Sequence, residues 1–385
     1  MADFALLESI REIPREEWNA LVADESPFLE WEWLASLEEA GCVGARASWS
    51  PRPLVARERG RLVAACPLYL KGNSEGEFVF DWGWAEAAQR AGIAYYPKLL
   101  VGVPFTPVSG ARFLTAAGED RPAWIRRFAA ALRDLCVGNE LSSVHVNFLR
   151  EDERSELEAA GFLLRSAFQY HWRNRAFASF DDYLASLTSK RRNQARRERR
   201  ELALQGVAID ALGGDALGDE LFDPMFEIYR ATVRANPWGR QYLNRRLFRL
   251  LRERWKHRLC FVRARVGEEL VAGTVNVQKG DALYGRYWGA LRPLRHLHFN
   301  VCYYAGIEHC ITRGLARFEP GAGGEYKQLR GFDATATWSA HFIADERLRA
   351  GVVRFLAAER EKVNGALEWY AEHSANRREE PPASE

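Results

Sequence analysis

The stretch VRARVGEELVA at residues 262–272 indicates the fold, because a similar stretch, VARERGRLVA, occupies residues 55–64. Val271 follows Val63 by 208 residues. Each copy has the pattern of a β-hairpin that runs into a longer strand, with helical patterns before it and a further helix and strand after it. Hairpins often look alike, but the same order of elements around both copies favours a duplicated α/β domain.

The length and composition fit such a duplication. A chain of 385 residues is longer than one hydrophobic core usually organises, and 47% hydrophobic with 28% charged residues is ordinary for a folded protein. The net charge of +2 gives no overall field that attracts polyanions. We therefore expect an N-terminal α/β domain over residues 1–165, a C-terminal one over residues 166–365, and a disordered polar tail over residues 366–385.

The sequence also predicts a cytoplasmic location. Its N-terminus lacks the basic flank and apolar core of a secretion signal, and its longest uncharged stretch, Leu99 to Ala111, is too short to span a bilayer. The six cysteines form no CxxC pair, so we expect free and mostly buried thiols.

Several common catalytic motifs are absent. The sequence has no GxxxxGK[ST] and no GxGxxG after a strand, which argues against a P-loop NTPase and a Rossmann nucleotide site; GxSxG and HExxH are also missing. His296, His298, His309 and Cys310 have a spacing that matches no common zinc site. We therefore expect no metal.

The segment FEPGAGGEYKQLRGF, residues 318–332, is the strongest candidate for a reactive site. A predicted strand ends at Glu319, and three glycines then form a loop that holds Glu325, Tyr326 and Lys327. Glycines let a backbone approach a ligand closely, and strand ends often carry reactive groups. We expect Glu319, Glu325 and Lys327 to be catalytic; the alternative is an ordinary surface loop.

Aromatic and charged residues elsewhere are candidates for substrate contacts. GRYWG at residues 285–289 is either the wall of a cleft for an anionic or base-bearing ligand, or an amphipathic strand. In the first half, Asp81 lies among tryptophans that are expected to pack in a core, and contact of Asp81 or Lys98 with a ligand stays open. The expected substrate-binding residues are Arg286, Tyr287, Trp288, Tyr303, Tyr304, Tyr326, Asp81, Trp82, Lys98 and His341.

The basic segment KRRNQARRERR, residues 190–200, is predicted to be helical. Such charge runs are usually solvated helix faces. Because acids are nearly absent from the run, contact with phosphates or tRNA through Arg192, Arg196 and Arg199 is the alternative.

Long segments of the chain resemble the FemAB-like family of peptidoglycan biosynthesis or recognition. They are KRRNQARRERRELALQGV, GRYWG, the run from Leu297 to Phe332, and the earlier FVFDWGWAEA, YYPKL and PFTPVSG. The similarity extends from Ser26 to about Lys362. The family belongs to the GNAT-like acyltransferases, so the resemblance implies tandem GNAT-like domains with mixed sheets flanked by helices. It also implies a Fem-type reaction, which moves an amino acid from aminoacyl-tRNA to an amine of a cell-wall precursor.

The chain departs from the family pattern at several positions. The family motif K-x-H-S-Y-G-E is KGNSEGEF here, with Asn73 and Glu75 in place of His and Tyr, and Asn300 replaces an acid after LHF. Residues 291–300 also lack the glycines whose amides hold the pyrophosphate of acetyl-CoA in GNAT enzymes, although Arg292 and Arg295 lie there. These differences imply an altered substrate or mechanism.

We therefore expect an acyltransferase that forms an amide bond, without a tightly bound cofactor. A carboxylate or water chain near Glu319 and Glu325 would take the proton of the attacking amine, and Lys327 or backbone amides would stabilise the oxyanion. Aminoacyl-tRNA, favoured by the basic helix, and acyl-CoA, favoured by the general GNAT pattern, are both possible donors. The acceptor is an amine-bearing small molecule or peptide. A non-catalytic module that binds a sugar–peptide or nucleotide-linked ligand is the alternative from a different class.

Overall fold

The structure, a computed structural model, describes residues 3–236 and 239–377. The chain divides into two compact units. Unit 1 contains Met1–Ala167, Tyr242–Trp255 and Ala336–Asn364, and unit 2 contains Phe168–Gln241, Lys256–Thr335 and Gly365–Glu385. None of the helices within the described ranges has the length and apolar character needed to cross a membrane.

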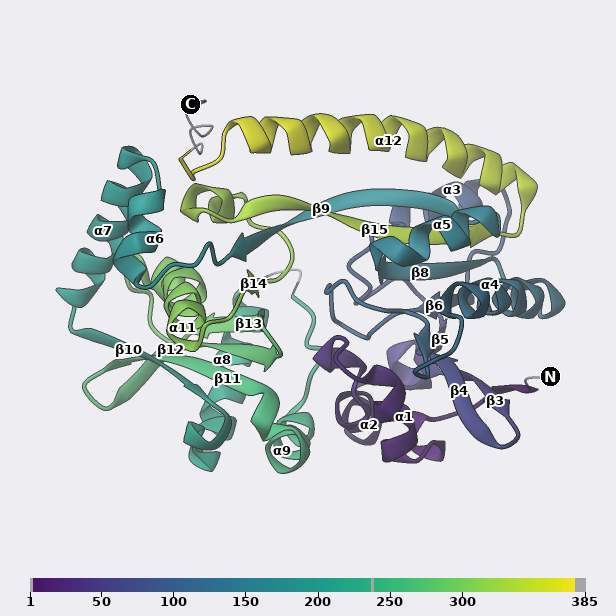
Figure 1. Cartoon of the computed structure of the whole chain (residues 1–385), viewed down its shortest axis with the longest axis horizontal. Helices are drawn as coiled ribbons and strands as arrows, with labels where there is room; N and C mark the ends of the chain where they lie inside the picture. Colours follow the sequence, from purple (N-terminus) through teal and green to yellow (C-terminus); the bar gives the residue numbers. More distant parts are fainter. Residues whose placement is uncertain (1–2, 237–238, 378–385) are drawn as a thin grey trace. The chain divides into compact units, whose positions relative to one another are not determined.

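Unit 1 contains two sheets (Figure 1). The first has the order β1-β3-β4-β7 and is antiparallel throughout; its strands are β1 (Asp3–Leu6), β3 (Leu54–Glu58), β4 (Arg61–Cys66) and β7 (Leu114–Thr115). The second has the order β2-β5-β6-β8-β15, and its β6–β8 pair is parallel. Its strands are β2 (Trp49–Pro51), β5 (Leu68–Lys71), β6 (Lys98–Val101), β8 (Ser143–Leu149) and the part of β15 (Asp333–Ile343) from Ala336 onward.

The helices of unit 1 cover these sheets with their apolar faces. They are α1 (Arg15–Val22), α2 (Trp31–Glu39), α3 (Trp82–Arg90), α4 (Arg121–Gly138), α5 (Glu151–Ala159), α9 (Arg245–Arg254) and the first part of α12 (Glu346–Glu372). Helix α4 is capped by the side chain of Asp120 and buries apolar residues at helical spacing, among them Trp124, Phe128 and Leu132. These pack with Val144 and Val146 of β8 in the main core of the unit.

Unit 2 contains one mixed sheet of order β10-β11-β12-β13-β14-β9 (Figure 1). Its strands are β10 (Val207–Gly213), β11 (Leu259–Val266), β12 (Glu269–Lys279), β13 (Ala282–Ala290), β14 (Arg317–Glu319) and the part of β9 (Leu163–Arg173) from Phe168 onward. Its helices are α6 (Phe180–Ser186), α7 (Ser189–Ala203), α8 (Phe222–Ala235), the short α10 (Leu297–Phe299) and α11 (Ala305–Arg313), with a π-helical turn over Asn300–Tyr304. The β13–β14 pair is parallel.

The two hairpins that predicted a duplication have the same geometry. In each, a two-residue loop is followed by two paired positions and then a shift in register, which leaves Val63 in one hairpin and Val271 in the other unpaired. Each hairpin also pairs with an earlier antiparallel strand, β1 or β10, that is separated from it by two α-helices. The equivalence expected from the sequence is therefore confirmed.

The sequence predicted two contiguous domains that meet between residues 165 and 166. The structure differs, because two later segments, Tyr242–Trp255 and Ala336–Asn364, also belong to unit 1. One contains α9 and ends in Trp255, whose ring packs against Phe28 and Trp33 and whose Nε1 donates to Glu30 at 2.7 Å. Helical spacing in a sequence shows that α9 is amphipathic, but it does not show which core the apolar face joins.

The expected disorder after residue 365 is wrong for the part of the tail that is described. Helix α12 continues to Glu372, Ala375 is buried, and the amide of Thr188 donates to its carbonyl at 2.9 Å. The polar tail is therefore anchored by backbone hydrogen bonds and one small apolar contact, which its composition does not reveal. Residues 378–385 lie outside the described ranges.

Candidate functional site

A row of polar side chains crosses one face of the second sheet of unit 1. Lys71 of β5 lies opposite Lys98 of β6, and His145 of β8 lies opposite His341 of β15. Neighbouring residues on a strand point to opposite faces, so the same strands place Leu99, Val144 and Val146 in the main core. The polar row is also buried, and none of its four members exceeds 1% exposure.

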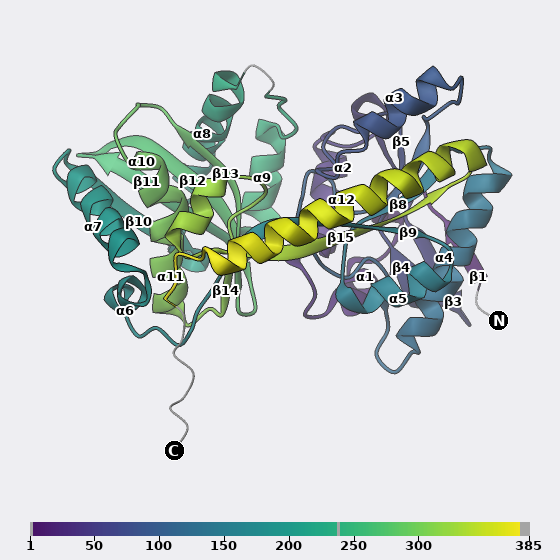
Figure 2. The same cartoon turned by 90° about the horizontal axis from the view of Figure 1, so that it is seen from above.

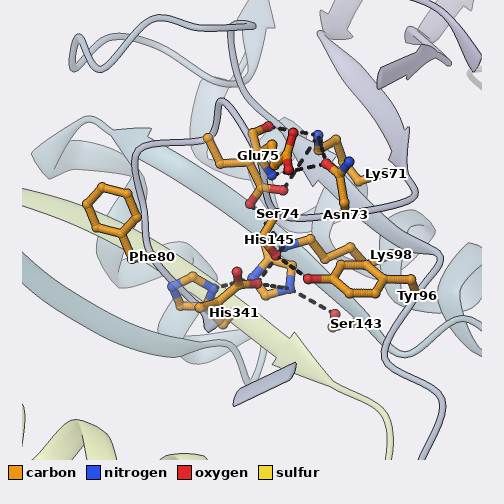
Figure 3. A network of polar contacts seen from close by, with 12 residues as sticks. Lys71, Asn73, Ser74, Glu75, Phe80, Tyr96, Lys98, Ser143, His145 and His341 are labelled. Atoms are coloured by element: carbon orange, nitrogen blue, oxygen red, sulfur yellow. Dashed lines mark hydrogen bonds and ion pairs between the residues drawn. The ribbon is translucent and has the colours of Figure 1, made fainter. Parts of the chain in front are cut away.

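Within this row, Lys98 bonds to three neighbouring side chains (Figure 3). Its Nζ donates to Ser74 Oγ at 3.0 Å, to Glu77 Oε2 at 3.0 Å and to Asp81 Oδ2 at 2.5 Å. Burial lowers the pKa of Lys98, but Glu77 and Asp81 outweigh burial and hold it above its usual value. Burial likewise raises the pKa of Asp81, and the Lys98 ammonium outweighs this and holds it well below its usual range. Both groups are therefore charged at neutral pH.

Lys71 extends the network toward the sheet edge. Its Nζ lies 3.9 Å from Glu77 Oε1, donates to the carbonyl of Glu75 at 3.1 Å and sits 3.9 Å from the centre of the Trp49 ring. Burial lowers the pKa of Lys71 to about 7 and raises that of Glu77 to about 7. This pair therefore changes protonation near neutral pH, unlike the Lys98–Asp81 pair.

Two histidines form a buried chain of hydrogen bonds at the other end of the row. The Nδ1 atoms of His145 and His341 are 2.6 Å apart, and their Nε2 atoms lie 2.8 Å from Ser143 Oγ and Ser339 Oγ. Burial lowers the pKa of both rings, that of His145 to about 3. Both rings are neutral, so one Nδ1 donates its proton to the other.

The segment predicted to be catalytic lies in unit 2, and its side chains differ in how deeply they are buried. Glu319 and Lys327 are buried, whereas Glu325 and Tyr326 are exposed. Burial raises the pKa of Glu319 to about 7 against the effect of Arg317, and it lowers the pKa of Lys327 to about 8. Lys327 Nζ donates to the carbonyl of Gly321 at 2.5 Å, so the lysine holds the glycine loop.

His171, on strand β9, completes this part of the site. Its Nε2 lies 3.8 Å from Glu319 Oε2, and neither atom has a hydrogen-bond partner within residues 3–236 and 239–377. Burial lowers the pKa of His171 to about 3, so the ring is neutral beside a carboxyl that titrates near pH 7. A buried carboxyl with such a pKa is suited to general acid or base chemistry.

The remaining substrate-binding candidates of unit 2 pack against other aromatic or charged side chains. Tyr287 lies 5.0 Å from Tyr229 and Trp288 lies 4.5 Å from His298, measured between ring centres. Tyr303 is stacked on Phe299, and Arg286 lies over the ring of Tyr287.

The basic helix α7 contains both half-buried and exposed arginines. Arg192 donates to the carbonyl of Leu187 at 3.4 Å near the end of α6, and Arg199 pairs with Glu308 at 3.0 Å while lying over the ring of Phe180. Arg196 is exposed, together with Lys190, Arg197 and Arg200.

The acid within the basic run, Glu198, is buried. It pairs with Arg330 at 2.8 Å and accepts from Tyr304 at 2.6 Å. The departure at Asn300 lies beside it, since the Asn300 amide donates to the carbonyl of Glu198 at 3.2 Å. This cluster joins α7 to the helical turn that follows β13.

Sequence reasoning did not include Lys71, Ser74, Glu77, His145 or His171 among the site residues. Two signals were present: Lys71, Ser74 and Glu77 match the family motif, and His145 and Asn147 alternate with Val144 and Val146 on an otherwise apolar strand. Asp81, Lys98 and His341 were expected, and the structure places them in one network; Trp82, next to Asp81, is exposed. Within the described part of the chain, no three His, Cys, Asp or Glu side chains lie close enough to hold a metal ion.

The duplicated hairpins and the mixed sheets flanked by helices define the tandem GNAT-like architecture that was predicted. A family model described as FemAB-like, peptidoglycan biosynthesis/recognition, matches residues 9–378, and the chain therefore belongs to the FemAB-like family. A search of curated proteins gave no match.

Solved structures share this fold at low sequence identity. FemX is 10% identical with a TM-score of 0.56 and covers 89% of this chain and 98% of its own. L-PGS from Bacillus licheniformis is 9% identical with a TM-score of 0.50, and it covers 84% of this chain and 95% of its own. The C-terminal domain of a putative lysylphosphatidylglycerol synthetase from Agrobacterium fabrum is 11% identical with a TM-score of 0.53, and it covers 91% and 96%. Family and fold together support a transferase that forms an amide or ester bond.

Proposed function

We propose that the protein is an N-acyltransferase that moves an aminoacyl group from aminoacyl-tRNA to an amine on a small molecule or peptide. The observation that carries this proposal is Glu319, a buried carboxyl at a strand end whose pKa is raised to about 7. An amine attacks an acyl carbon only when it is neutral, and a base with a pKa near the working pH removes its proton most effectively. Glu319 is the base in this proposal.

The reaction forms one bond and breaks another. The amine nitrogen attacks the ester carbonyl carbon, and the amine proton passes to Glu319 directly or through one water. Glu319 then returns that proton to the tRNA oxygen as the bond between this oxygen and the acyl carbon breaks. Lys327 or the neighbouring backbone amides stabilise the tetrahedral oxyanion. The His171 ring lies beside Glu319 Oε2. Glu325 is the other carboxylate of the segment 318–332.

Two observations support aminoacyl-tRNA as the donor. Helix α7 exposes Lys190, Arg196, Arg197 and Arg200, which suit a polyanion. In addition, residues 291–300 contain no glycine, and so lack the flexible backbone that cradles the pyrophosphate of coenzyme A in GNAT enzymes. The donor is a co-substrate in the cytoplasm, and no tightly bound cofactor is needed.

The network around Lys98 has a supporting role in this proposal. Lys71, Ser74 and Glu77, which match the family motif, are all buried and bonded to one another or to Lys98. They fix the loop between β5 and α3.

The test is to incubate the protein with labelled aminoacyl-tRNAs and labelled acyl-CoAs, each with a panel of amines. The proposal expects a labelled amide from the tRNA arm and none after Glu319→Gln. Amide formation from acyl-CoA but not from aminoacyl-tRNA would show that acyl-CoA is the donor. Melting shifts with donors or acceptors, but no product from either arm, would instead identify a binding module.

A further inference from the structure

Unit 1 contains an apolar pocket that the proposed reaction does not use. It has a volume of about 360 Å³ and lies between α3 and the first turns of α12, both labelled in Figure 2. Its lining includes Trp84, Arg347, Leu348, Gly351, Val352 and Phe355. We infer that this pocket binds the hydrocarbon chain of an anionic amphiphile, with Arg347 at the anionic head.

The small residues of the two helices create the space. Gly83 of α3 and Gly351 of α12 both line the pocket, and a Cβ atom added to either would meet no heavy atom within 4 Å. An apolar cavity of about 150 Å³ is enough to take a benzene molecule. The larger pocket therefore has room for a chain of several methylene groups.

The walls suit a hydrocarbon because they offer aromatic and aliphatic carbon. The side chain of Phe355 is 46% exposed, which is unusual for a residue of its size, and its ring meets that of Trp84 edge-on at 6.2 Å. Leu348 and Val352 are buried behind them. A chain in the pocket would cover the exposed part of Phe355 and gain the free energy of apolar burial.

Arg347 gives the pocket its preference for a negative charge. It is the charged residue of the lining, and its side chain is 72% exposed. Its partner is Asp345 at 3.0 Å. Exposed ion pairs of this kind contribute little to stability, so the guanidinium is able to exchange that partner for a ligand carboxylate.

The test is calorimetric titration of the full chain with octanoate, decanoate, decylammonium and decyl maltoside, all below their micelle concentrations. We expect decanoate to bind more tightly than decylammonium. Each added CH₂ should tighten binding about fourfold, which corresponds to ~0.8 kcal/mol per methylene group, until the pocket is filled.

Two matched glycine variants locate the site. Gly351→Leu fills the pocket and should weaken decanoate binding at least tenfold, while the helix gains a better helix former. Gly365→Leu lies on the same helix, also with no heavy atom within 4 Å of the added Cβ, but outside the pocket, and should leave binding unchanged. Arg347→Gln should weaken decanoate but not decyl maltoside.

Two outcomes overturn the inference: no binding of decanoate, or equal binding by the two glycine variants. Equal affinity for all three decyl compounds would show an apolar pocket without anion selectivity and would contradict the role of Arg347. Because the readout is binding, its result does not depend on whether the proposed transfer reaction occurs.

Discussion

The Nε2 atom of His171 lies 3.8 Å from Oε2 of Glu319, across the neighbouring strands β9 and β14. Both atoms are buried and lack a hydrogen-bond partner among the residues that the structure describes. The two atoms are too far apart to hydrogen-bond to each other, so each has an unused capacity for one hydrogen bond. The proposed base therefore carries an oxygen that no described residue occupies.

The raised pKa of Glu319 predicts a loss of stability as pH rises. The folded state holds this proton up to about pH 7, whereas an unfolded glutamate loses it near 4.5. Between these values the folded state binds more protons, so unfolding becomes easier with increasing pH. Glu319→Gln should remove this effect and stabilise the protein by up to ~3 kcal/mol at pH 8.

Denaturant unfolding at pH 5 and pH 8 measures that difference. Glu268→Gln is the control, because Glu268 is fully exposed on the β11–β12 turn. This substitution should leave the free energy of unfolding unchanged at both pH values. A Glu319→Gln variant that loses as much stability with pH as the wild type would contradict the pKa assigned to Glu319.

Lys327→Met tests the oxyanion role of the lysine. The substitution keeps a similar shape but removes the charge, and loss of one oxyanion donor typically lowers kcat about 100- to 1000-fold. Burial disfavours the Lys327 ammonium, but the substitution also removes its hydrogen bond to the Gly321 carbonyl, so the melting temperature should fall by no more than the loss of one such bond produces. Steady-state kinetics and thermal unfolding separate the two effects, with the exposed Lys362→Met as the control. Normal kcat in a folded Lys327→Met variant would remove Lys327 from the mechanism.

The exposed face of α7 should determine tRNA affinity. Replacing Arg196, Arg197 and Arg200 with Gln should weaken tRNA binding and reduce the slope of log K against log salt by about 0.7–0.9 for each phosphate that is no longer neutralised. Arg192→Gln is the matched control, because Arg192 donates to backbone carbonyls near the end of α6. Filter binding at several salt concentrations gives both slopes. An unchanged slope in the folded triple variant would make this face an ordinary solvated surface.

The Lys98–Asp81 pair should be important for folding. Asp81→Asn leaves a buried ammonium with one fewer carboxylate, and breaking such a buried pair costs about 3–5 kcal/mol. Glu86→Gln on the same helix α3 breaks only the exposed pair with Arg90 and should cost less than about 1 kcal/mol. Urea unfolding compares the two variants, and equal losses would show that the buried network does not fix the β5–α3 loop.

Local sequence patterns predicted the local structure well. The strand expected at Ser143 to Phe148 is β8, and the basic run forms α7 as expected. The repeated pattern predicted two equivalent hairpins, and the structure shows the same register shift at Val63 and at Val271. These features depend on residues that are close in the chain, so their spacing is sufficient evidence.

Long-range pairing was not predictable in the same way. Arg199 pairs with Glu308, more than one hundred residues later in the chain, and nothing in the basic run indicates this partner. Glu198 looked like an exception in a basic surface, yet it is the buried partner of Arg330. Burial decides which charges are internal, and a single sequence does not record which distant segment supplies the partner.

Glu319 is the proposed base for acyl transfer, and the pH dependence of single-turnover transfer from aminoacyl-tRNA measures its protonation during the reaction. We predict that the wild-type rate rises with pH through about pH 7 and then levels off, because Glu319 acts only when deprotonated. Glu319→Gln should transfer the acyl group about 100- to 10,000-fold more slowly, and its rate should not rise with pH. The rate of Glu325→Gln should still rise with pH through about pH 7. A folded Glu319→Gln variant with the wild-type rate and pH profile would show that Glu319 is not the base.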